Sequence, residues 1–180
     1  MIFVFFLFIL LFAIILIFSS KKFSPIPYFP SNKKDLDLIL RALNLKKNQI
    51  IFDLGAGDGL VIFAAAKKSH QKKLDTKFIA VEINPILLLI LNMRRFFHPN
   101  KKNIKIIRGD IFKMNYNQLT SKQANQATFY LYISPWYLEK TLSNIKKQIK
   151  KFSIVSYMYP IKSLKKKERI VNGLNSIYIY

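Results

Sequence analysis

The chain has 180 residues, no cysteine and a formal net charge of +21, with 30 lysines and arginines against 9 aspartates and glutamates. The lack of cysteine excludes disulfides and thiolate metal sites, and the only histidines, His70 and His98, lie among polar and basic residues, so we predict no metal site. A basic surface can attract anionic lipid or nucleic acid, although the lysine pairs are scattered along the chain, which favours a compositional origin for much of the charge.

The chain begins with an apolar run, residues 2–18, that contains no polar residue. At about 1.5 Å per residue it reaches roughly 26 Å, close to the hydrocarbon thickness of a thin bilayer. No basic segment precedes the run and no small-residue cleavage motif follows it, which favours an uncleaved anchor over a signal peptide or a peripheral hairpin. Lys21 and Lys22 follow directly. The positive-inside rule therefore predicts a single-pass membrane protein with its C-terminal part in the cytoplasm.

We predict three parts: a transmembrane anchor over residues 1–20, a juxtamembrane segment rich in proline and aromatic residues over 21–34, and one α/β domain over 35–180. The expected strands are residues 49–54, 77–82, 104–108, 128–133 and 152–157. The expected helices are a short one ending near residue 44, then 60–68, 85–97 and 135–151, with a closing hairpin around Gly173. Apolar strands that alternate with helices predict a doubly wound, mostly parallel, seven-stranded Rossmann-like sheet with a C-terminal antiparallel hairpin.

The most informative stretch is IIFDLGAGDGL, residues 50–60, a buried strand that runs into a loop with three glycines. A dinucleotide fingerprint needs its third glycine one residue later, where Leu60 stands. The strand also carries an acid, Asp53, and a carboxylate suits the ammonium and sulfonium of S-adenosylmethionine better than a pyrophosphate. We therefore expect an S-adenosylmethionine site formed by Asp53, Gly55, Ala56, Gly57, Asp58 and Gly59.

Two more acids follow the next two strands. Glu82 ends the second strand, where its carboxylate can accept hydrogen bonds from both ribose hydroxyls. Asp110 follows the third strand and can accept from the adenine amino group. In doubly wound folds ligands bind beyond the carboxyl ends of the strands. Three acids at three successive strand ends thus predict one cofactor site.

The motifs D-L-G-A-G-D-G, A-V-E-I-N-P and R-G-D-I-F, in this order and spacing, resemble those of class I S-adenosylmethionine-dependent methyltransferases. More narrowly, the chain resembles the small single-domain protein-lysine N-methyltransferases, which include broad-specificity archaeal enzymes, a membrane-anchored mitochondrial group and bacterial relatives. The segment P-Y-F-P-S matches the P-Y-V-P-[ST] motif of that group. The resemblance runs from about Pro27 to the C-terminus.

The resemblance implies that the glycine loop holds the methionine end of the cofactor, that Glu82 with Ile83 holds the ribose, and that Asp110 with Ile111 holds the adenine. It also implies that residues 28–31 fold over the cofactor. From its place at the end of the fourth apolar run, we also expect Tyr132 to contact the cofactor. Two positions depart from the group: Leu60 stands where arginine is usual, and residues 156–159 replace an S-H-x-[FD] motif. These departures concern catalysis more than cofactor binding.

For the acceptor we predict an aromatic slot built from Tyr28, Ser134, Pro135 and Trp136, to which Tyr132 can also contribute. A protein lysine is the favoured substrate, which we expect in or near the same membrane. Two of these residues have alternative structural roles: Trp136 can pack on the core, and Tyr28 can anchor the chain at a membrane interface. Ser134-Pro135-Trp136 also partly matches the [DNS]-P-P-[YFW] motif of nucleic-acid amino-methyltransferases, which keeps RNA or DNA as a less favoured partner. A small-molecule or lipid acceptor and an inactive cofactor-binding membrane protein are further alternatives. No oligomeric state is predicted.

Overall fold

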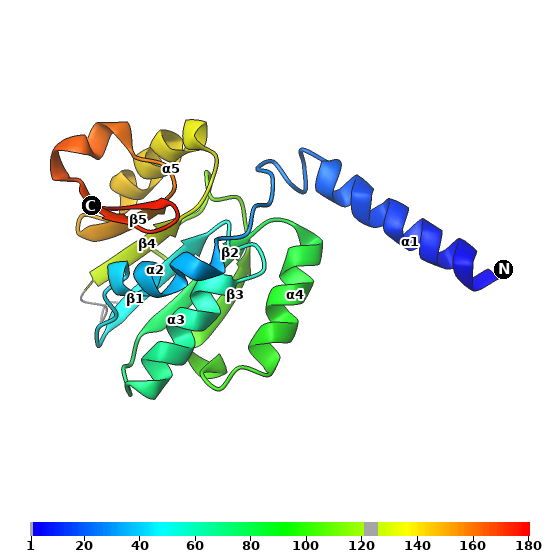
Figure 1. Ribbon diagram of the computed structural model, residues 1–180, viewed down its shortest axis with the longest axis horizontal. Helices are drawn as coiled ribbons and strands as arrows, with labels where there is room; N and C mark the ends of the chain where they lie inside the picture. The colour runs from blue at the N-terminus through cyan, green and yellow to red at the C-terminus, as the bar shows by residue number, and fades with distance from the viewer. Residues whose placement is uncertain (1, 121–125) are drawn as a thin grey trace.

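The computed structural model describes residues 2–120 and 126–180 and contains one α/β domain with a helix extending from it (Figure 1). The helices are α1 (Ile2–Ser19), α2 (Leu36–Ala42), α3 (Leu60–Gln71), α4 (Pro85–Phe96) and α5 (Pro135–Gln148). The strands are β1 (Gln49–Leu54), β2 (Lys77–Glu82), β3 (Ile104–Arg108), β4 (Gln126–Leu131), β5 (Phe152–Tyr157), β6 (Arg169–Asn172) and β7 (Ser176–Ile179). Three short 3-10 helices are η1 (Lys33–Asp35), η2 (Lys101–Asn103) and η3 (Lys162–Lys167).

The strands form one seven-stranded sheet in the order β3-β2-β1-β4-β5-β7-β6. The first five strands in this order run parallel, and β7 pairs antiparallel with both β5 and β6. One apolar cluster lies between the sheet and α2, α3 and α4, and a second packs α5 on the opposite face. The order reverses between β1 and β4, which is where a doubly wound sheet opens a crevice for a ligand. The predicted doubly wound fold is thus confirmed.

The structure moves four predicted boundaries, both ends of β4 and the last residues of α3 and α5, by two or three residues. β4 begins and ends two residues earlier than predicted, because its register with β1 pairs residues 49–54 with 126–131 and leaves Tyr132 and Ile133 in the following loop. α3 continues to Gln71, and α5 ends at Gln148 because Ile149 has an extended backbone, with φ −120°. The shift of β4 matters most, since it frees Tyr132 to reach the ligand crevice.

α1 has no buried residue within Ile2–Ser19, and its mean hydropathy is 3.3. It is long and apolar enough to cross a membrane. Figure 1 shows it projecting away from the domain, with the following residues turning back over the sheet. The apolar N-terminal helix is therefore present as predicted, and it contacts the domain at α4.

A buried aspartate ties the C-terminal hairpin to the start of α2. Asp35 is 1% exposed, and its carboxylate accepts hydrogen bonds from Tyr157 Oη at 2.7 Å, Leu174 N at 2.7 Å and Asn175 N at 3.0 Å. Burial alone would raise its pKa, but these hydrogen bonds together hold the pKa below the ordinary value. A Cβ atom on Gly173 would collide with Asp35 Oδ1, so the turn of the hairpin requires glycine at that position.

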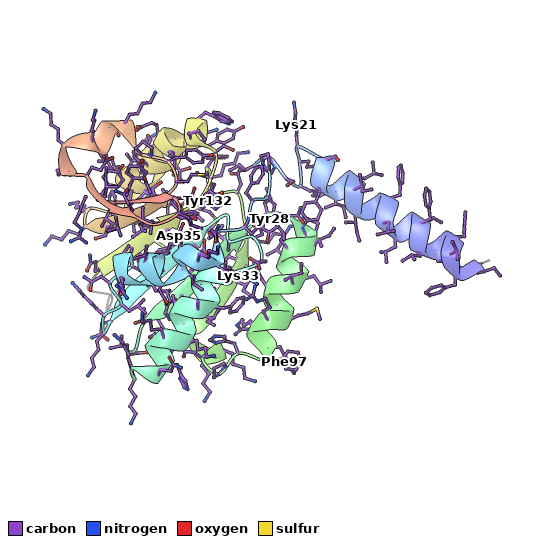
Figure 2. All side chains as sticks on the ribbon, viewed as in Figure 1. Lys21, Tyr28, Lys33, Asp35, Phe97 and Tyr132 are labelled. Atoms are coloured by element: carbon purple, nitrogen blue, oxygen red, sulfur yellow. The ribbon has the colours of Figure 1, made fainter. Side chains whose placement is uncertain are left out.

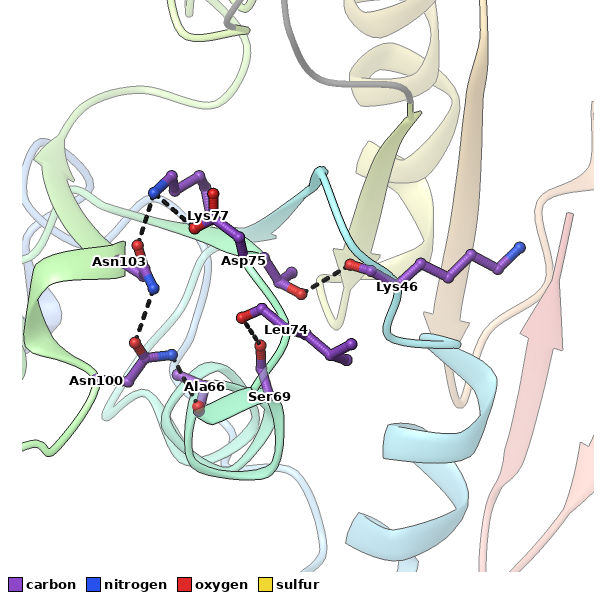
Figure 3. Close-up of polar contacts among 9 residues, drawn as sticks. Lys46, Ala66, Ser69, Leu74, Asp75, Lys77, Asn100 and Asn103 are labelled. Atoms are coloured by element: carbon purple, nitrogen blue, oxygen red, sulfur yellow. Dashed lines mark hydrogen bonds and ion pairs between the residues drawn. The ribbon is translucent and has the colours of Figure 1, made fainter. Parts of the chain in front are cut away.

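Polar contacts close the loops at the amino edge of the sheet (Figure 3). Lys77 Nζ lies 2.9 Å from Asp75 Oδ1 and donates to Asn103 Oδ1 at 2.7 Å. Asn100 Nδ2 donates to the carbonyl of Ala66 at 3.0 Å. These bonds pair polar groups of the connecting loops at the amino edge, whereas the predicted site residues lie at the opposite, carboxyl edge of the sheet.

Candidate active site

The loop after β1 has a backbone that only glycine adopts readily. Gly55, Gly57 and Gly59 have φ of 78°, 57° and 79°. The amides of Gly55 and Ala56 donate to the carbonyl of Val81 at 2.9 and 3.0 Å, which ties the loop to β2. A Cβ atom on Gly57 would lie 2.6 Å from Tyr28 Cε2. Gly57 is therefore needed both for its backbone conformation and for the close approach of Tyr28.

Glu82 holds the turns after β1 and β2 together. It is 7% exposed, and its Oε2 accepts from the amide of Gly57 at 2.8 Å. Its Oε1 accepts from the amides of Ile83 and Asn84 at 2.7 and 2.9 Å. A carboxylate offers about four lone-pair sites, so Glu82 keeps capacity for a ligand hydroxyl after making these bonds. Glu82 thus shapes the loop and borders the ligand crevice at once.

Among the carboxyl groups of the site, Asp53 has the most strongly shifted pKa. Burial, followed by the nearby charges of Glu82 and Asp58, raises its pKa to about 8, against the lowering effect of a hydrogen bond from the Ile62 amide. Asp58 has its own partner, since Arg94 Nη1 lies 2.9 Å from Asp58 Oδ2. Asp53 and Glu82 form no ion pair with any residue that the structure describes. The cluster is therefore poised for a cationic ligand, whose charge would lower the pKa of Asp53.

Two adjoining clefts open at the carboxyl edge of the sheet. The larger is lined by Ser24, Pro25, Ile26, Pro27, Tyr28, Phe29, Gly55, Val81, Glu82, Ile83, Leu87, Gly109, Asp110, Ile111, Phe112, Tyr132 and Ile133. The smaller is lined by Tyr28, Phe29, Pro30, Ser31, Asp53, Gly55, Ala56, Gly57, Asp58, Leu60, Val61, Tyr130 and Tyr132. The predicted ribose and adenine residues thus line the larger cleft, and the predicted methionine-end residues line the smaller. Gly59 lines neither cleft and is the N-cap residue before α3, where a Cβ would meet Leu91 and Phe63 at 2.6 Å.

Residues 24–31, which we call the strap, cross both clefts and carry the chain from α1 to α2. Ser31 Oγ and Tyr130 Oη are hydrogen-bonded at 2.8 Å, which fixes the far end of the strap to β4. Tyr28 lies over the glycine loop, and burial, followed by the charge of Asp58, raises its pKa. Figure 2 shows Tyr28 and Tyr132, which border both clefts, on the side of the domain from which α1 departs.

The comparisons with known proteins agree with this geometry. A family model described as ribosomal RNA adenine dimethylase matches residues 20–170. The chain belongs to the ribosomal RNA adenine dimethylase family. As the sequence predicted, this family member is a class I S-adenosylmethionine-dependent methyltransferase.

Curated relatives fall into two groups by name. A protein-lysine N-methyltransferase of Saccharolobus islandicus is 28% identical over 160 residues, which cover 86% of this chain and 92% of that protein. A lysine N-methyltransferase of Homo sapiens that is named for ATP synthase is 24% identical, covering 53% of this chain and 38% of that protein. The ribosomal RNA small subunit methyltransferase A of Mycoplasma mycoides is 32% identical, covering 58% of this chain and 36% of that protein.

Among solved structures, an RNA methyltransferase from Salinibacter ruber in complex with S-adenosyl-L-homocysteine superposes with a TM-score of 0.66 at 20% identity. The match covers 84% of this chain and 92% of that one. This likeness confirms the Rossmann-like methyltransferase fold.

The residues of the methyltransferase clefts fit S-adenosylmethionine, which supplies an activated methyl group when bound. Asp53 offers a buried carboxyl group to its cationic end, and Glu82 offers its remaining lone-pair site within the larger cleft. Asp110 has one oxygen, Oδ1, that accepts from the Phe112 amide at 2.9 Å, which leaves its other oxygen for a ligand amine. The side chains of the strap cover these groups and limit the access of water.

The predicted acceptor residues are only partly brought together. Tyr28 and Tyr132 border both clefts, whereas Ser134, Pro135 and Trp136 lie at the start of α5 and line neither. The Trp136 side chain is 75% exposed. The role of these three residues in holding the acceptor stays a prediction.

Sequence reasoning missed Tyr130 as a site residue. Tyr130 is 2% exposed, lines the smaller cleft and bonds Ser31 from within β4. The alternation of residues along β4 was the available signal, because Tyr130 and Tyr132 are two apart and so point to the same face.

Proposed function

We propose that this methyltransferase transfers a methyl group to a lysine of a protein in or near the membrane that α1 enters. The extent of the sequence match carries the proposal. The alignment with the Saccharolobus protein-lysine enzyme covers 92% of that protein, whereas the alignment with the Mycoplasma ribosomal RNA enzyme covers 36% of it. A match over nearly the whole length of a relative supports a shared substrate class better than a match over its cofactor-binding domain alone.

The smaller cleft supports a lysine acceptor through its chemistry. Its walls include the aromatic rings of Tyr28, Tyr130 and Tyr132 beside the carboxyl group of Asp53. Aromatic faces attract an alkylammonium ion, and a partly desolvated pocket lowers the pKa of a lysine from its reference value of about 10.4. The aromatic rings would attract the lysine side chain on entry, and its burial in the cleft would favour the loss of the proton that must leave before methyl transfer.

α1 supports a membrane location for this activity. The helix is apolar throughout, and Lys21 and Lys22 follow it within a few residues of the strap. If α1 spans the bilayer, these lysines favour a cytoplasmic position for the domain. The strap that covers the clefts would then lie directly above the bilayer surface.

The test is transfer of labelled methyl groups from S-adenosylmethionine to membranes of the native host by the full-length protein. We expect label that is released by protease, survives nuclease, and yields methyl-lysine on hydrolysis. Asp53→Asn is the inactive control, and Asp37→Asn, at an exposed aspartate of α2, is the matched active control. Label in protein but on another residue type would contradict the lysine assignment.

A second candidate, methylation of an adenine amino group in RNA, is favoured by the description of the family model and by exposed Trp136 after Ser134-Pro135. The net charge of +21 would assist binding to phosphates. The same experiment separates this candidate, because RNA-borne label is lost to nuclease and survives protease. Label that partitions into the organic phase would instead identify a lipid acceptor.

A further inference from the structure

The outer face of α4 carries an apolar stripe: Leu89, Met93, Phe96 and Phe97, which are 61%, 58%, 67% and 81% exposed. The first three residues are spaced by four and three positions, so they lie on one side of the helix, and Phe97 follows at its end. The opposite side packs into the domain through Leu87 and Leu91, which are 4% and 0% exposed. Because a helix on a soluble surface normally turns a polar face outward, an apolar outer face indicates a surface that another phase or molecule covers.

Positive charge borders the far end of this stripe. Lys101 Nζ lies 5.3 Å from the centroid of the Phe96 ring, and Lys102 neighbours it in η2. In the described part of the chain, ion pairs join Lys77 to Asp75 and Arg94 to Asp58, and neither Lys101 nor Lys102 takes part in one. A set of exposed aromatic and aliphatic side chains beside uncompensated lysines is complementary to the interface of an anionic bilayer.

The position of α1 indicates which surface this is. α1 and α4 are in contact, and Figure 1 shows α1 leaving the domain beside α4 and running across its direction. Phe97 lies at the far end of α4, at the outer edge of the domain (Figure 2). A bilayer that α1 crosses would therefore present its surface along the length of α4.

We propose that the α4 stripe, with Lys101 and Lys102, docks on the anionic phospholipid surface of the bilayer that α1 enters. The inference rests on the proposed anchoring by α1. Docking fixes the orientation of the domain relative to the membrane, so that the strap and the openings of both clefts face the bilayer surface. Without docking, the domain would reorient freely about its connection to α1. Acceptors within a few residues of the membrane are then within reach, and acceptors far from it are not.

The absence of cysteine from the chain allows a clean site-specific test. Full-length Met93→Cys and Leu174→Cys variants, each labelled with an environment-sensitive fluorophore, are reconstituted into phosphatidylcholine vesicles with or without phosphatidylglycerol. Leu174 is the matched control because it is also apolar and 63% exposed, and it lies in the β6–β7 turn, at the opposite end of the strand order from β3, which α4 contacts. Nitroxide-bearing lipids should quench the label at residue 93 several-fold more than the label at residue 174, and aqueous iodide should show the reverse order.

Two changes in the labelled Met93→Cys protein probe the two parts of the surface. Phe96→Ser with Phe97→Ser should remove most of the lipid quenching, and Lys101→Glu with Lys102→Glu should remove its dependence on phosphatidylglycerol. Equal iodide access at residues 93 and 174 in floated vesicles would overturn docking while leaving anchoring intact. Protection from iodide without lipid quenching would also overturn it, in favour of a second copy or another protein on α4. Failure of the protein to float with vesicles would contradict the anchor itself.

Discussion

At the scale of single residues, Asp53 affects both the stability of the ligand-free protein and its ability to bind a ligand. Its pKa is raised to about 8 by burial, Glu82 and Asp58, whereas an unfolded aspartate titrates near 4. The folded state therefore binds this proton more tightly than the unfolded state. The contribution of Asp53 to stability is fully present below about pH 4 and is lost as the pH rises through about 8.

Asp53→Asn removes this loss, because an amide does not ionise. In the absence of ligand we expect Asp53→Asn to raise the free energy of unfolding by on the order of 1–3 kcal/mol at pH 8.5, with little difference at pH 4. The same variant should lose the stabilisation by S-adenosylmethionine that the unmodified protein shows. Thermal unfolding of the full chain in detergent, at both pH values with and without the cofactor, gives all these quantities. If Asp53→Asn lowered the free energy of unfolding at pH 8.5, the conclusion that ionised Asp53 destabilises the folded protein would be wrong.

Gly57 and Gly55 form a matched pair for testing the strap. Both have positive φ, so alanine at either costs about 1–2 kcal/mol in backbone conformation. Only at Gly57 does the added Cβ also collide with Tyr28, at 2.6 Å, whereas at Gly55 it would touch Ile133 at 3.4 Å. We expect Gly57→Ala to weaken S-adenosylmethionine binding more than Gly55→Ala does. In a Tyr28→Ala background the difference between the two should vanish, as calorimetric affinities in a double-mutant cycle would show. A difference that persisted would place its cause outside the strap.

Trp136 tests the predicted acceptor slot. Because its side chain is exposed and lines neither cleft, Trp136→Ala should leave the cofactor affinity unchanged. If the side chain contacts the acceptor, turnover should fall by about tenfold, the effect of one lost aromatic contact. Steady-state rates of labelled methyl transfer measure this, and unchanged turnover would remove Trp136 from the site.

At the scale of elements, the C-terminal hairpin depends on Asp35. Asp35→Ala would leave Tyr157 Oη and the amides of Leu174 and Asn175 without their acceptor. We expect a loss of about 2–4 kcal/mol in the free energy of unfolding, against less than about 0.5 kcal/mol for Asp37→Ala, which lies exposed in the adjoining helix. Because the pKa of Asp35 is lowered in the folded protein, its contribution persists at neutral pH and is lost on acidification below the ordinary carboxyl value. Denaturant titrations at two pH values test both statements, and equal losses for the two variants would refute them.

The elements also show where prediction from sequence succeeds and where it fails. β1, β2, β3 and β5 have the predicted bounds. Polar or glycine residues end the first three apolar runs locally, and β5 ends where Met158 takes a positive φ of 72°. Asp53, Glu82 and Asp110 meet at one edge because parallel strands align their carboxyl ends. The bonds from Asp35 to Tyr157 and from Ser31 to Tyr130 join residues 122 and 99 positions apart. No local pattern carries that information, and an aspartate before a helix is ordinarily interpreted as a cap.

At the scale of the whole molecule, the anchor, the strap and the clefts follow one another along the chain. The exposed apolar helix leads through Lys21 and Lys22 into residues 24–31, which cover the clefts. We expect the full-length protein to remain in the membrane pellet after alkaline carbonate extraction, since an apolar helix of this length inserts with a large favourable free energy. Release into the supernatant would show that α1 does not span the bilayer. A shorter product in the cell would instead identify α1 as a cleaved signal.

The central claim is that the acid-lined clefts under the strap bind S-adenosylmethionine. Calorimetric titration of the detergent-solubilised full chain with S-adenosylmethionine tests it most directly, with Asp53→Asn as the disabled variant and Asp37→Asn as the matched control. We predict one site per chain with a dissociation constant in the micromolar range, abolished by Asp53→Asn and retained by Asp37→Asn. Binding weaker than millimolar, or binding that survives Asp53→Asn unchanged, would contradict the account.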